Sequence, residues 1–341
     1  MNNPPVILIP DHPSPNAEIE QKVFGSEGKI IVAHGSHHSE ISDQVWADTD
    51  AILVWHWMNL PTEAIAKLER CKVIVRIGVG FDSVDIKAAG KQGIQVCNVP
   101  DYGTSDVADH AIALMLTLSR GLYAFSENIR QSNENWHWQS AGTLHRLAGA
   151  TIGIIGLGRI GTAAALRAKA FGMRVLFYDP YAPDGRDKAL GITRCDQLEK
   201  LAAQSDVVSI HAPLTEETQG MLDEAFFAQL KPGAIIINTA RGAIIDLDAL
   251  AKALKSGVVR AAGLDVLPQE PPDPNHPLIK AWHQREPWIA YRLMITPHAA
   301  FYCQEAFEEM RRKAALEVKG VLEGKPARNC INQHWLSIPS Q

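Results

Sequence analysis

Short apolar runs alternate with longer amphipathic segments along most of the chain. Five β-rich runs come first, with helical patterns between them, at residues 6–9, 29–32, 51–55, 73–77 and 94–97. A second series starts at Thr151 and continues through residues 174–178, 207–210, 234–238, 261–266 and 293–296. These later runs are continuously apolar, which is typical of parallel strands with helices on both faces of the sheet. The pattern predicts two successive parallel α/β units.

The segments around the second series predict how the units are connected. Residues 105–130 contain no Pro and carry Asp106 and Asp109 near their start, so we expect one long interdomain helix there. Residues 131–147 are polar apart from Trp136 and Trp138 and predict a loop that packs on another surface. Helical spacing of apolar residues over 304–323, ended by Gly324, predicts a final helix.

Two domains follow from this organisation and from the length of 341 residues, since single cores rarely grow past about 300 residues. We expect one domain to comprise residues 1–104 and 303–341 and the other residues 105–302. The tail after Pro326 contains Trp335 and Leu336, so we expect it to pack against the first of these domains.

Composition narrows the class of protein. With 46% apolar and 21% charged residues the chain is an ordinary globular one, which excludes fibrous and disordered proteins. A net charge of −5 leaves no cationic surplus for nucleic acid or an anionic membrane. No run of 18 apolar residues occurs and the N-terminus lacks a basic segment, so we expect a cytoplasmic protein. Five scattered cysteines without a CxxC pair predict reduced thiols and no metal site.

A glycine-rich motif follows the strand that starts at Thr151. Gly156, Gly158 and Gly161 form GxGxxG at the mouth of a predicted helix over 159–171. Such glycines allow a tight turn, close approach of backbone N–H groups to a pyrophosphate, and close packing of helix on strand. Asp179 ends the next strand, where a carboxylate can bind the ribose hydroxyls and repel a 2′-phosphate. The motif therefore predicts NAD in preference to NADP.

Three chemically complementary residues follow three later strands. Arg241 comes after 234–238, Glu270 after 261–266 and His298 after 293–296. Ligands of open α/β sheets bind beyond the carboxyl ends of the strands, so these residues can converge. Arginine binds a carboxylate, histidine exchanges protons near neutral pH, and a neighbouring glutamate stabilises imidazolium. Each of these three residue types on its own is typical of a protein surface. Only their joint placement after three successive strands indicates a catalytic site.

With these motifs the chain resembles the D-isomer-specific 2-hydroxyacid dehydrogenase family over nearly its whole length. The matching stretches are VRIGVGFDSVDI, NVP, GIIGLGRIG, NTARG, LDVLPQEP and ITPHAA. Within the family it looks closest to the branch of the C-terminal-binding-protein corepressors. The resemblance implies an α/β fold with two Rossmann-like parallel-sheet domains, a flavodoxin-like substrate domain and an NAD-binding Rossmann domain.

The resemblance also implies residue roles. His298 is the general acid/base, Glu270 its partner, and Arg241 orients the substrate, whose carboxylate also meets the backbone N–H groups of Val79 and Gly80. Aromatic walls are expected from Trp55 and Phe301. The implied cofactor-binding residues are Gly156, Gly158, Arg159, Ile160, Gly161, Asp179, His211, Thr239, Ala240 and Asp265, of which Asp265 would hold the nicotinamide carboxamide.

The resulting prediction is an NAD-dependent oxidoreductase that interconverts a small 2-keto acid and its D-2-hydroxy acid by hydride transfer. Two alternatives stay open: an NAD(H)-sensing, protein-binding module like the corepressors, and a dehydrogenase of another small anion. As in relatives, a homodimer is expected, with the Trp136 and Trp138 loop at the contact. For the aromatic insertion between Glu270 and His298, with Trp282, Trp288 and Tyr291, two placements stay open: over the cleft or in a partner subunit.

Several other polar residues have simpler interpretations. His37 and His38 predict a polar surface turn and not a metal site. His110 predicts a structural hydrogen bond. Residues 311–313, Arg-Arg-Lys, follow Glu308 and Glu309, which predicts a paired solvent-facing surface and not a nucleic-acid patch.

Overall fold

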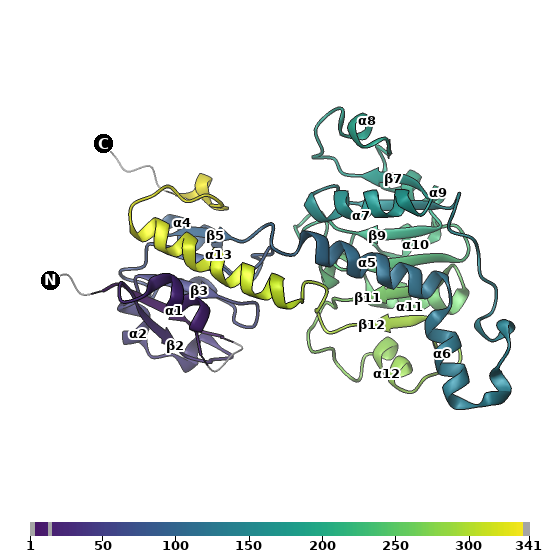
Figure 1. Ribbon diagram of the computed structural model, residues 1–341, viewed down its shortest axis with the longest axis horizontal. Helices are drawn as coiled ribbons and strands as arrows, with labels where there is room; N and C mark the ends of the chain where they lie inside the picture. The colour runs from purple at the N-terminus through teal and green to yellow at the C-terminus, as the bar shows by residue number, and fades with distance from the viewer. Residues whose placement is uncertain (1–3, 13–15, 337–341) are drawn as a thin grey trace. The chain divides into compact units, whose positions relative to one another are not determined.

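The computed structural model describes residues 4–12 and 16–336 and divides into two compact units. One unit consists of Met1–Gly103 and Cys303–Gln341, and the other of Thr104–Tyr302. Each contains one all-parallel sheet, and Figure 1 shows both. The predicted α/β class with two Rossmann-like parallel sheets is confirmed. No helix among the described residues has the length and apolar character needed to cross a bilayer.

The first unit is built on five strands in the order β2-β1-β3-β4-β5. The strands are β1 (Val6–Ile9), β2 (Lys29–Val32), β3 (Ala51–Val54), β4 (Val73–Arg76) and β5 (Gln95–Asn98). This is the flavodoxin-like order. The central strands β3 and β4 are buried along their whole length, which explains why they consist of Ala, Ile, Leu and Val except for Arg76 at the end of β4.

Helices cover this sheet, and the chain returns to it at the end. The helices of the unit are α1 (Glu18–Phe24), η1 (His38–Glu40), α2 (Asp43–Ala47), α3 (Thr62–Ile65), α4 (Ile86–Lys91), α13 (Gln304–Leu322) and η5 (Gln333–Trp335). The long α13 packs on α1, β3 and β4. After it, Ile331 donates its backbone N–H to Val96 of β5 at 2.8 Å, and Lys87 lies over the Trp335 ring. The expected packing of the tail is confirmed for residues 330–335, while residues 337–341 lie outside the described part.

The second unit contains seven strands in the order β12-β11-β10-β9-β6-β7-β8. The strands are β6 (Thr151–Ile155), β7 (Arg174–Tyr178), β8 (Thr193–Arg194), β9 (Val207–Ile210), β10 (Ala234–Asn238), β11 (Val259–Leu264) and β12 (Leu293–Ile295). Relative to chain order, the sheet reverses between β6 and β9, as in Rossmann folds. Only the two-residue β8 has no counterpart in the sequence-based prediction.

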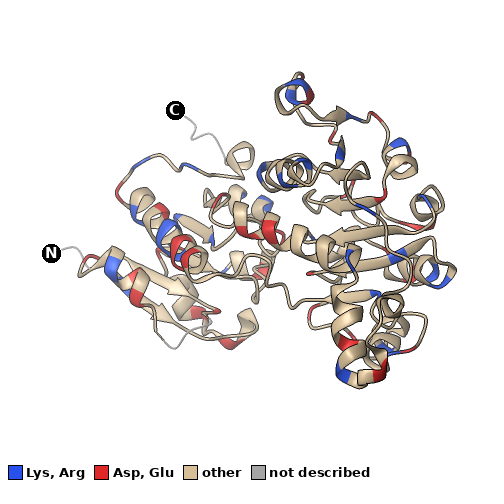
Figure 2. Ribbon diagram, turned by 45° about the vertical axis from the view of Figure 1, so that its right-hand side comes forward, with Lys and Arg blue, Asp and Glu red and all other residues tan. Residues whose placement is uncertain are grey.

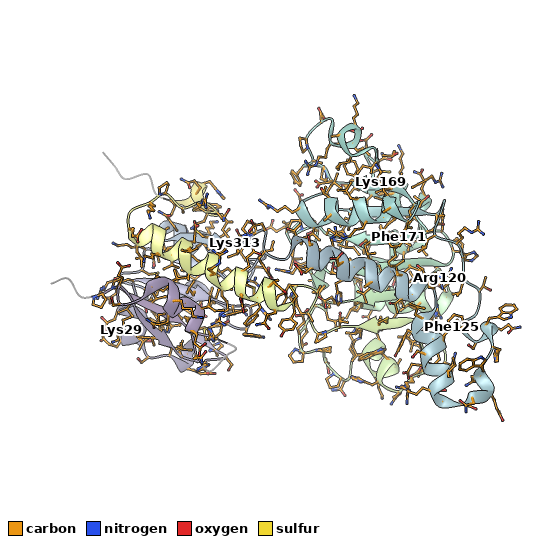
Figure 3. The ribbon with its side chains drawn as sticks, in the orientation of Figure 1. Lys29, Arg120, Phe125, Lys169, Phe171 and Lys313 are labelled. Carbon is orange, nitrogen blue, oxygen red and sulfur yellow. The ribbon has the colours of Figure 1, made fainter. Side chains whose placement is uncertain are left out.

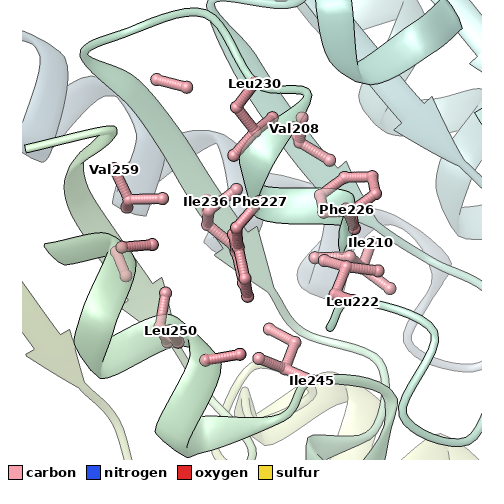
Figure 4. Packing of buried hydrophobic residues seen from close by; sticks show 14 of the residues in the cluster. Val208, Ile210, Leu222, Phe226, Phe227, Leu230, Ile236, Ile245, Leu250 and Val259 are labelled. Carbon is pink, nitrogen blue, oxygen red and sulfur yellow. The ribbon is translucent and has the colours of Figure 1, made fainter. Parts of the chain in front are cut away.

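Apolar clusters lie on the two faces of this sheet. The helices of the unit are α5 (Thr104–Ser119), α6 (Leu122–Gln131), η2 (Asn133–Asn135), η3 (Trp138–Ala141), α7 (Arg159–Ala170), α8 (Arg186–Leu190), α9 (Leu198–Gln204), α10 (Glu224–Ala228), η4 (Gly242–Ile244), α11 (Leu247–Ser256) and α12 (Pro277–His283). Helices α5 and α7 pack on one face and α9 to α12 on the other. Figure 4 shows the second cluster, to which α10 contributes Phe226 and Phe227, α11 contributes Leu250 and β10 contributes Ile236.

The prediction of a single long helix over residues 105–130 is wrong. The chain forms α5 and α6 instead, and Figure 1 shows the change of direction between them. Gly121 has a φ of 65°, in the left-handed region, where helical hydrogen bonding cannot continue. α5 buries Val107, Ala111 and Leu114 among others, whereas α6 buries no residue.

The prediction that residues 311–313 face solvent is also wrong in part. Arg311 is buried and forms a bidentate ion pair with Glu20 of α1, at 2.8 and 2.6 Å. Lys313, labelled in Figure 3, does form the expected local pair with Glu309 at 2.6 Å and a second one with Asp101 at 2.9 Å. Figure 2 shows Asp and Glu interleaved with Lys and Arg along this helix, as expected for a surface without a basic patch.

The aromatic insertion before His298 packs within its own unit. Leu278, Ile279 and Ile289 lie in the core beside α11 and β11. Trp282 donates its indole N–H to the backbone oxygen of Leu293 at 3.1 Å. The guanidinium of Arg292 donates to four backbone carbonyl groups, at 2.6 to 2.9 Å. The insertion therefore supports the start of β12.

Candidate active site

The carboxyl ends of β10, β11 and β12 lead into the three loops that carry Arg241, Glu270 and His298. These strands are neighbours in the sheet, so their ends emerge side by side. The Nδ1 atom of His298 lies 2.7 Å from Oε2 of Glu270, which makes a hydrogen-bonded pair of residues 28 positions apart. The two side chains are 25% and 34% exposed, so the pair is open to a ligand. Nδ1 is therefore the ring nitrogen that pairs with Glu270, and an imidazole can exchange a proton near neutral pH.

The Arg241 loop is joined to the Glu270 loop by a close backbone contact. A Cβ atom on Gly242 would lie 1.9 Å from the carbonyl carbon of Leu267, so only glycine fits there. Leu267 in turn donates its N–H to Oε1 of Glu270 at 2.9 Å. Arg241 is held by its own turn, since its carbonyl oxygen accepts from the Asn238 side chain at 2.9 Å. This packing keeps all three loops at one edge of the sheet.

Asp265 is the anchor of the His298 turn. Its side chain is 1% exposed and accepts hydrogen bonds from the Thr296 hydroxyl at 2.6 Å and from the N–H groups of Ala299 and Ala300 at 2.9 Å each. His298 has a φ of 52°, in the left-handed region that non-glycine residues rarely occupy. Strain of this kind persists where the surroundings hold it, and here Asp265 does so.

The glycine-rich turn lies where the strand order reverses. Gly156 has a φ of 87°, and a Cβ atom there would lie 2.6 Å from the backbone N of Ala212. A Cβ on Gly161 would lie 2.0 Å from the carbonyl oxygen of Gly156, whereas Gly158 has nothing within 4 Å on that side. Next to it, the first N–H groups of α7, those of Arg159 and Ile160, point at this opening without helical acceptors. This geometry suits a pyrophosphate.

Asp179 ends β7 beside that turn. Its Oδ2 accepts from the backbone N–H of Leu157 at 2.8 Å and its Oδ1 from that of Tyr181 at 2.9 Å. The carboxylate thus shapes the glycine-rich turn, and each oxygen keeps a further lone pair for a ribose hydroxyl.

Two buried polar atoms near the strand ends have no hydrogen-bond partner among the described residues. They are Nδ1 of His211, after β9, and Oγ1 of Thr239, after β10. Burial lowers the pKa of His211 to about 4, so its ring is neutral at physiological pH. Ala240 follows Thr239, and its N–H is taken by Asn238 at 3.0 Å. Unpartnered buried polar atoms need an explanation, and a polar cofactor along this edge would supply partners.

Three of the four remaining expected substrate residues, Val79, Gly80 and Trp55, lie in the first unit. Val79 and Gly80 follow β4, and the carbonyl oxygen of Val79 accepts from the Asn98 side chain at 2.6 Å. Trp55 is 1% exposed and stacks on Trp57, which is 50% exposed, at 5.7 Å between ring centroids. Trp55 is thus a buried support, and Trp57 is the ring that faces outward. Phe301, in the second unit, is partly buried beside Tyr302.

Three supporting residues escaped the sequence analysis. Asp11, after β1, is buried and accepts the N–H groups of Trp55, Trp57 and Met58, and burial raises the pKa of its carboxyl despite these hydrogen bonds. Arg76 is buried beneath the Gly78 turn and donates to the Ile77 carbonyl at 3.0 Å. Thr296 bonds Asp265. Charged residues that end apolar strands are the signal that would have identified Asp11 and Arg76.

The simpler interpretations of other histidines are confirmed in most cases. His110 forms the expected hydrogen bond, to Thr296 at 3.0 Å. His37 is exposed, but His38 is buried, so the surface interpretation is wrong for His38. Its ring packs on His37 at 4.2 Å and lies beside Glu63. Within residues 4–12 and 16–336, no three His, Cys, Asp or Glu side chains form a group that could hold a metal ion.

Comparison with known proteins is consistent with this geometry. Residues 112–300 match the family model described as D-isomer specific 2-hydroxyacid dehydrogenase, NAD binding domain. The chain is 32% identical over 346 residues to C-terminal-binding protein 1 of Caenorhabditis elegans, covering 98% of this chain and 46% of the relative. It is 35% identical over 326 residues to D-3-phosphoglycerate dehydrogenase of Methanocaldococcus jannaschii, covering 96% and 59%. The chain spans about half the length of the curated relatives it matches.

A solved structure matches over nearly the full length of both chains. It is D-lactate dehydrogenase from Aquifex aeolicus, complexed with NAD and lactic acid. The TM-score is 0.82 at 30% sequence identity, and the match covers 96% of this chain and 99% of that one.

Proposed function

The chain belongs to the D-isomer-specific 2-hydroxyacid dehydrogenase family, and we propose that it is an NAD-dependent oxidoreductase interconverting a small 2-keto acid and its D-2-hydroxy acid. NAD is the cofactor of the domain that residues 112–300 match. The observation that carries the proposed activity is the His298–Glu270 hydrogen bond of 2.7 Å, beside Arg241 at the ligand-binding edge of the sheet.

Each of these residues has a role that its chemistry supports. The Glu270 carboxylate accepts a hydrogen bond from Nδ1 of His298 and so orients the ring, and the proposed role of Nε2 is to give a proton to the oxygen of the carbonyl being reduced. The guanidinium of Arg241 binds the substrate carboxylate and stabilises negative charge on that oxygen. Backbone N–H groups of Val79 and Gly80 are proposed as further donors to the carboxylate.

Bound NADH supplies the hydride for the carbonyl carbon. Gly156, Gly158 and Gly161 with the N–H groups of Arg159 and Ile160 would hold its pyrophosphate, and Asp179 the adenosine ribose. His211, Thr239, Ala240 and Asp265 are proposed to line the rest of the cofactor site. The unpartnered Nδ1 of His211 and Oγ1 of Thr239 support this assignment.

We further propose that the first unit is the substrate domain and the second the NAD-binding domain, divided at residues 104/105 and 302/303. We place the chain nearest the corepressor branch, because VRIGVGFD and NTARG follow that branch's pattern. Its identities of 32% and 35% to members of two branches do not separate them. Because the chain is similar to a member of the corepressor branch, an NAD(H)-sensing, protein-binding role is the second candidate function of this chain.

A homodimer is the proposed assembly and the cytoplasm the proposed location. Trp136 and Trp138 are 76% and 77% exposed in the single chain, and exposed aromatic side chains of this size are enriched at interfaces. All five cysteines are free thiols, which suits a reducing compartment.

Turnover with a panel of keto acids tests the proposed function. NADH oxidation is followed with glyoxylate, pyruvate, 2-oxobutyrate, 4-methylthio-2-oxobutyrate and phenylpyruvate. Because Trp57, supported by the buried Trp55, and Phe301 offer apolar surface, we expect the highest kcat/KM beyond pyruvate, with about tenfold or more per methylene gained. His298→Ala should lose about 100-fold or more in rate.

The outcomes separate the alternatives. A protein that binds NADH but reduces none of the five acids would be the protein-binding module or a dehydrogenase of another small anion. A best substrate of glyoxylate, or of a phosphorylated keto acid, would refute the aromatic pocket and leave the dehydrogenase activity standing.

A further inference from the structure

A chain of hydrogen bonds connects helix α5 to the turn that carries His298. Nε2 of His110, on α5, lies 3.0 Å from Oγ1 of Thr296, and the Thr296 hydroxyl lies 2.6 Å from Oδ1 of Asp265. The ring of His110 is also 3.7 Å from that carboxylate. All of these residues belong to the second unit. The catalytic turn is therefore connected to a helix on one face of the sheet.

The chemistry of the groups sets the direction of each hydrogen bond. The other partners of the Asp265 carboxylate are N–H groups, those of Ala299 and Ala300, so its oxygens act as acceptors. A threonine hydroxyl has one proton, and here it goes to Asp265. The Thr296 oxygen must then accept from His110, which places an N–H on Nε2 of that ring.

Asp265 in turn fixes the backbone around His298 by hydrogen bonds. Its carboxylate holds the two residues after His298, and its backbone carbonyl accepts the His298 N–H at 2.8 Å. The left-handed φ of 52° at His298 is disfavoured for a side chain of this kind and needs such support. If the Thr296 hydroxyl turned away, Oδ1 of Asp265 would lose its shortest hydrogen bond.

We propose that His110 is a positioning residue for the reaction: its Nε2–H fixes the Thr296 hydroxyl on Asp265 and thereby keeps His298 in line with its substrate. This inference rests on the proposed function, in which His298 exchanges the proton. His110 touches neither substrate nor cofactor in this role. It acts only through Thr296 and Asp265.

Three substitutions test the connection. His110→Leu removes the donor at similar size, His110→Gln retains an N–H donor at similar reach, and Thr296→Val removes the hydroxyl without changing the shape. We expect kcat to fall about tenfold or more in His110→Leu and Thr296→Val, because small displacements of catalytic groups are costly. The Kd for NADH should stay within about threefold, and His110→Gln should recover most of kcat.

The double variant His110→Leu/Thr296→Val is the sharpest comparison. Because both changes break one connection, the double variant should be no slower than the worse single variant. Asp109→Asn is the matched control on α5, since Asp109 is exposed and pairs with Arg167 on α7. Its kcat should equal that of the wild type.

A second measurement does not depend on activity. Hydrogen exchange of the Ala299 and Ala300 amides reports how firmly Asp265 holds the turn. Exchange in the cofactor-free protein should be faster in His110→Leu and Thr296→Val, and unchanged in His110→Gln and Asp109→Asn. Unchanged exchange in both disrupting variants, or losses of kcat that add in the double variant, would overturn the proposal.

Failure of the proposed function is distinguishable from failure of this inference. A wild-type protein that reduces no keto acid overturns the function, while the exchange measurements still decide whether His110 orders the turn. An active wild type with an equally active His110→Leu variant overturns the inference alone.

Discussion

Replacing Arg311 with methionine should destabilise the first unit in a pH-dependent way. Arg311 of α13 donates two hydrogen bonds to the carboxylate of Glu20 on α1, at 2.8 and 2.6 Å, and approaches Nε2 of His12 at 3.1 Å. The Arg311 and Glu20 side chains are 6% and 0% exposed. Methionine retains the apolar stem and removes the charge, which leaves Glu20 buried without its cation.

The structure sets the size of the effect. Burial alone would raise the pKa of Glu20, but hydrogen bonds from His12 and Arg311 and the charge of Arg311 lower it from 4.5 to about 2. At about 1.4 kcal/mol for each pKa unit, the ionised carboxylate contributes about 3 kcal/mol to folding. Because the folded pKa is depressed, this contribution is complete above about pH 4.5 and is lost as the pH falls through about 2.

Urea unfolding of the wild type and Arg311→Met at pH 7 and pH 3 measures this contribution. We expect the variant to lose about 3 kcal/mol of unfolding free energy at pH 7, and the gap to narrow to about 1.4 kcal/mol at pH 3. Arg312→Met is the matched control, since Arg312 is the next residue of α13 and is exposed. Its loss should stay below about 0.5 kcal/mol.

Two results would refute this reasoning. One is an Arg311→Met variant no less stable than Arg312→Met at pH 7. The other is a gap that stays constant between pH 7 and pH 3, which would show that the cost comes from packing and not from the ion pair.

Two further predictions concern the cofactor and the assembly. In Asp179→Ala, the ratio of kcat/KM with NAD(H) to that with NADP(H) should fall at least about tenfold, because the carboxylate that repels a 2′-phosphate is gone; an unchanged ratio would mean that the ribose is recognised elsewhere. Light scattering should give about twice the chain mass of 37.4 kDa, and Trp136→Ser/Trp138→Ser should shift the protein toward monomer. A wild-type monomer at micromolar concentration contradicts the dimer.

Much of the fold was predictable from local sequence. The strands Val6–Ile9, Arg174–Tyr178, Val207–Ile210 and Ala234–Asn238 have the bounds expected from their apolar runs. A strand buried on both faces is apolar along most of its length, so the ends of the apolar run indicate the ends of the strand. The GxGxxG turn was predictable for the same reason, because the backbone geometry of Gly156 excludes other residues wherever the rest of the chain lies. The chemical roles of the site residues stay predictions.

Other features depended on contacts between distant segments. The break at Gly121 was visible as a glycine, but only packing decided that the chain would turn there. Arg311 has acidic neighbours on its own helix, yet its partner is Glu20, 291 residues away. His110 was expected to form a structural hydrogen bond and Thr296 lies in the ITPHAA stretch, but nothing local indicated that these two residues would pair with each other.

The difference has one physical cause. Backbone conformation and the burial of a strand are governed by neighbouring residues and their period, which a sequence displays directly. The partner of a buried charge or hydroxyl is determined by which faces of which elements pack together, and many pairings are compatible with the same local pattern. The sequence therefore determined the strands, the cofactor turn and the three loops of the candidate site. The family resemblance already implied that Glu270 is the partner of His298. Only the tertiary structure decided that Asp265 holds the His298 turn and that Arg311 is buried against Glu20.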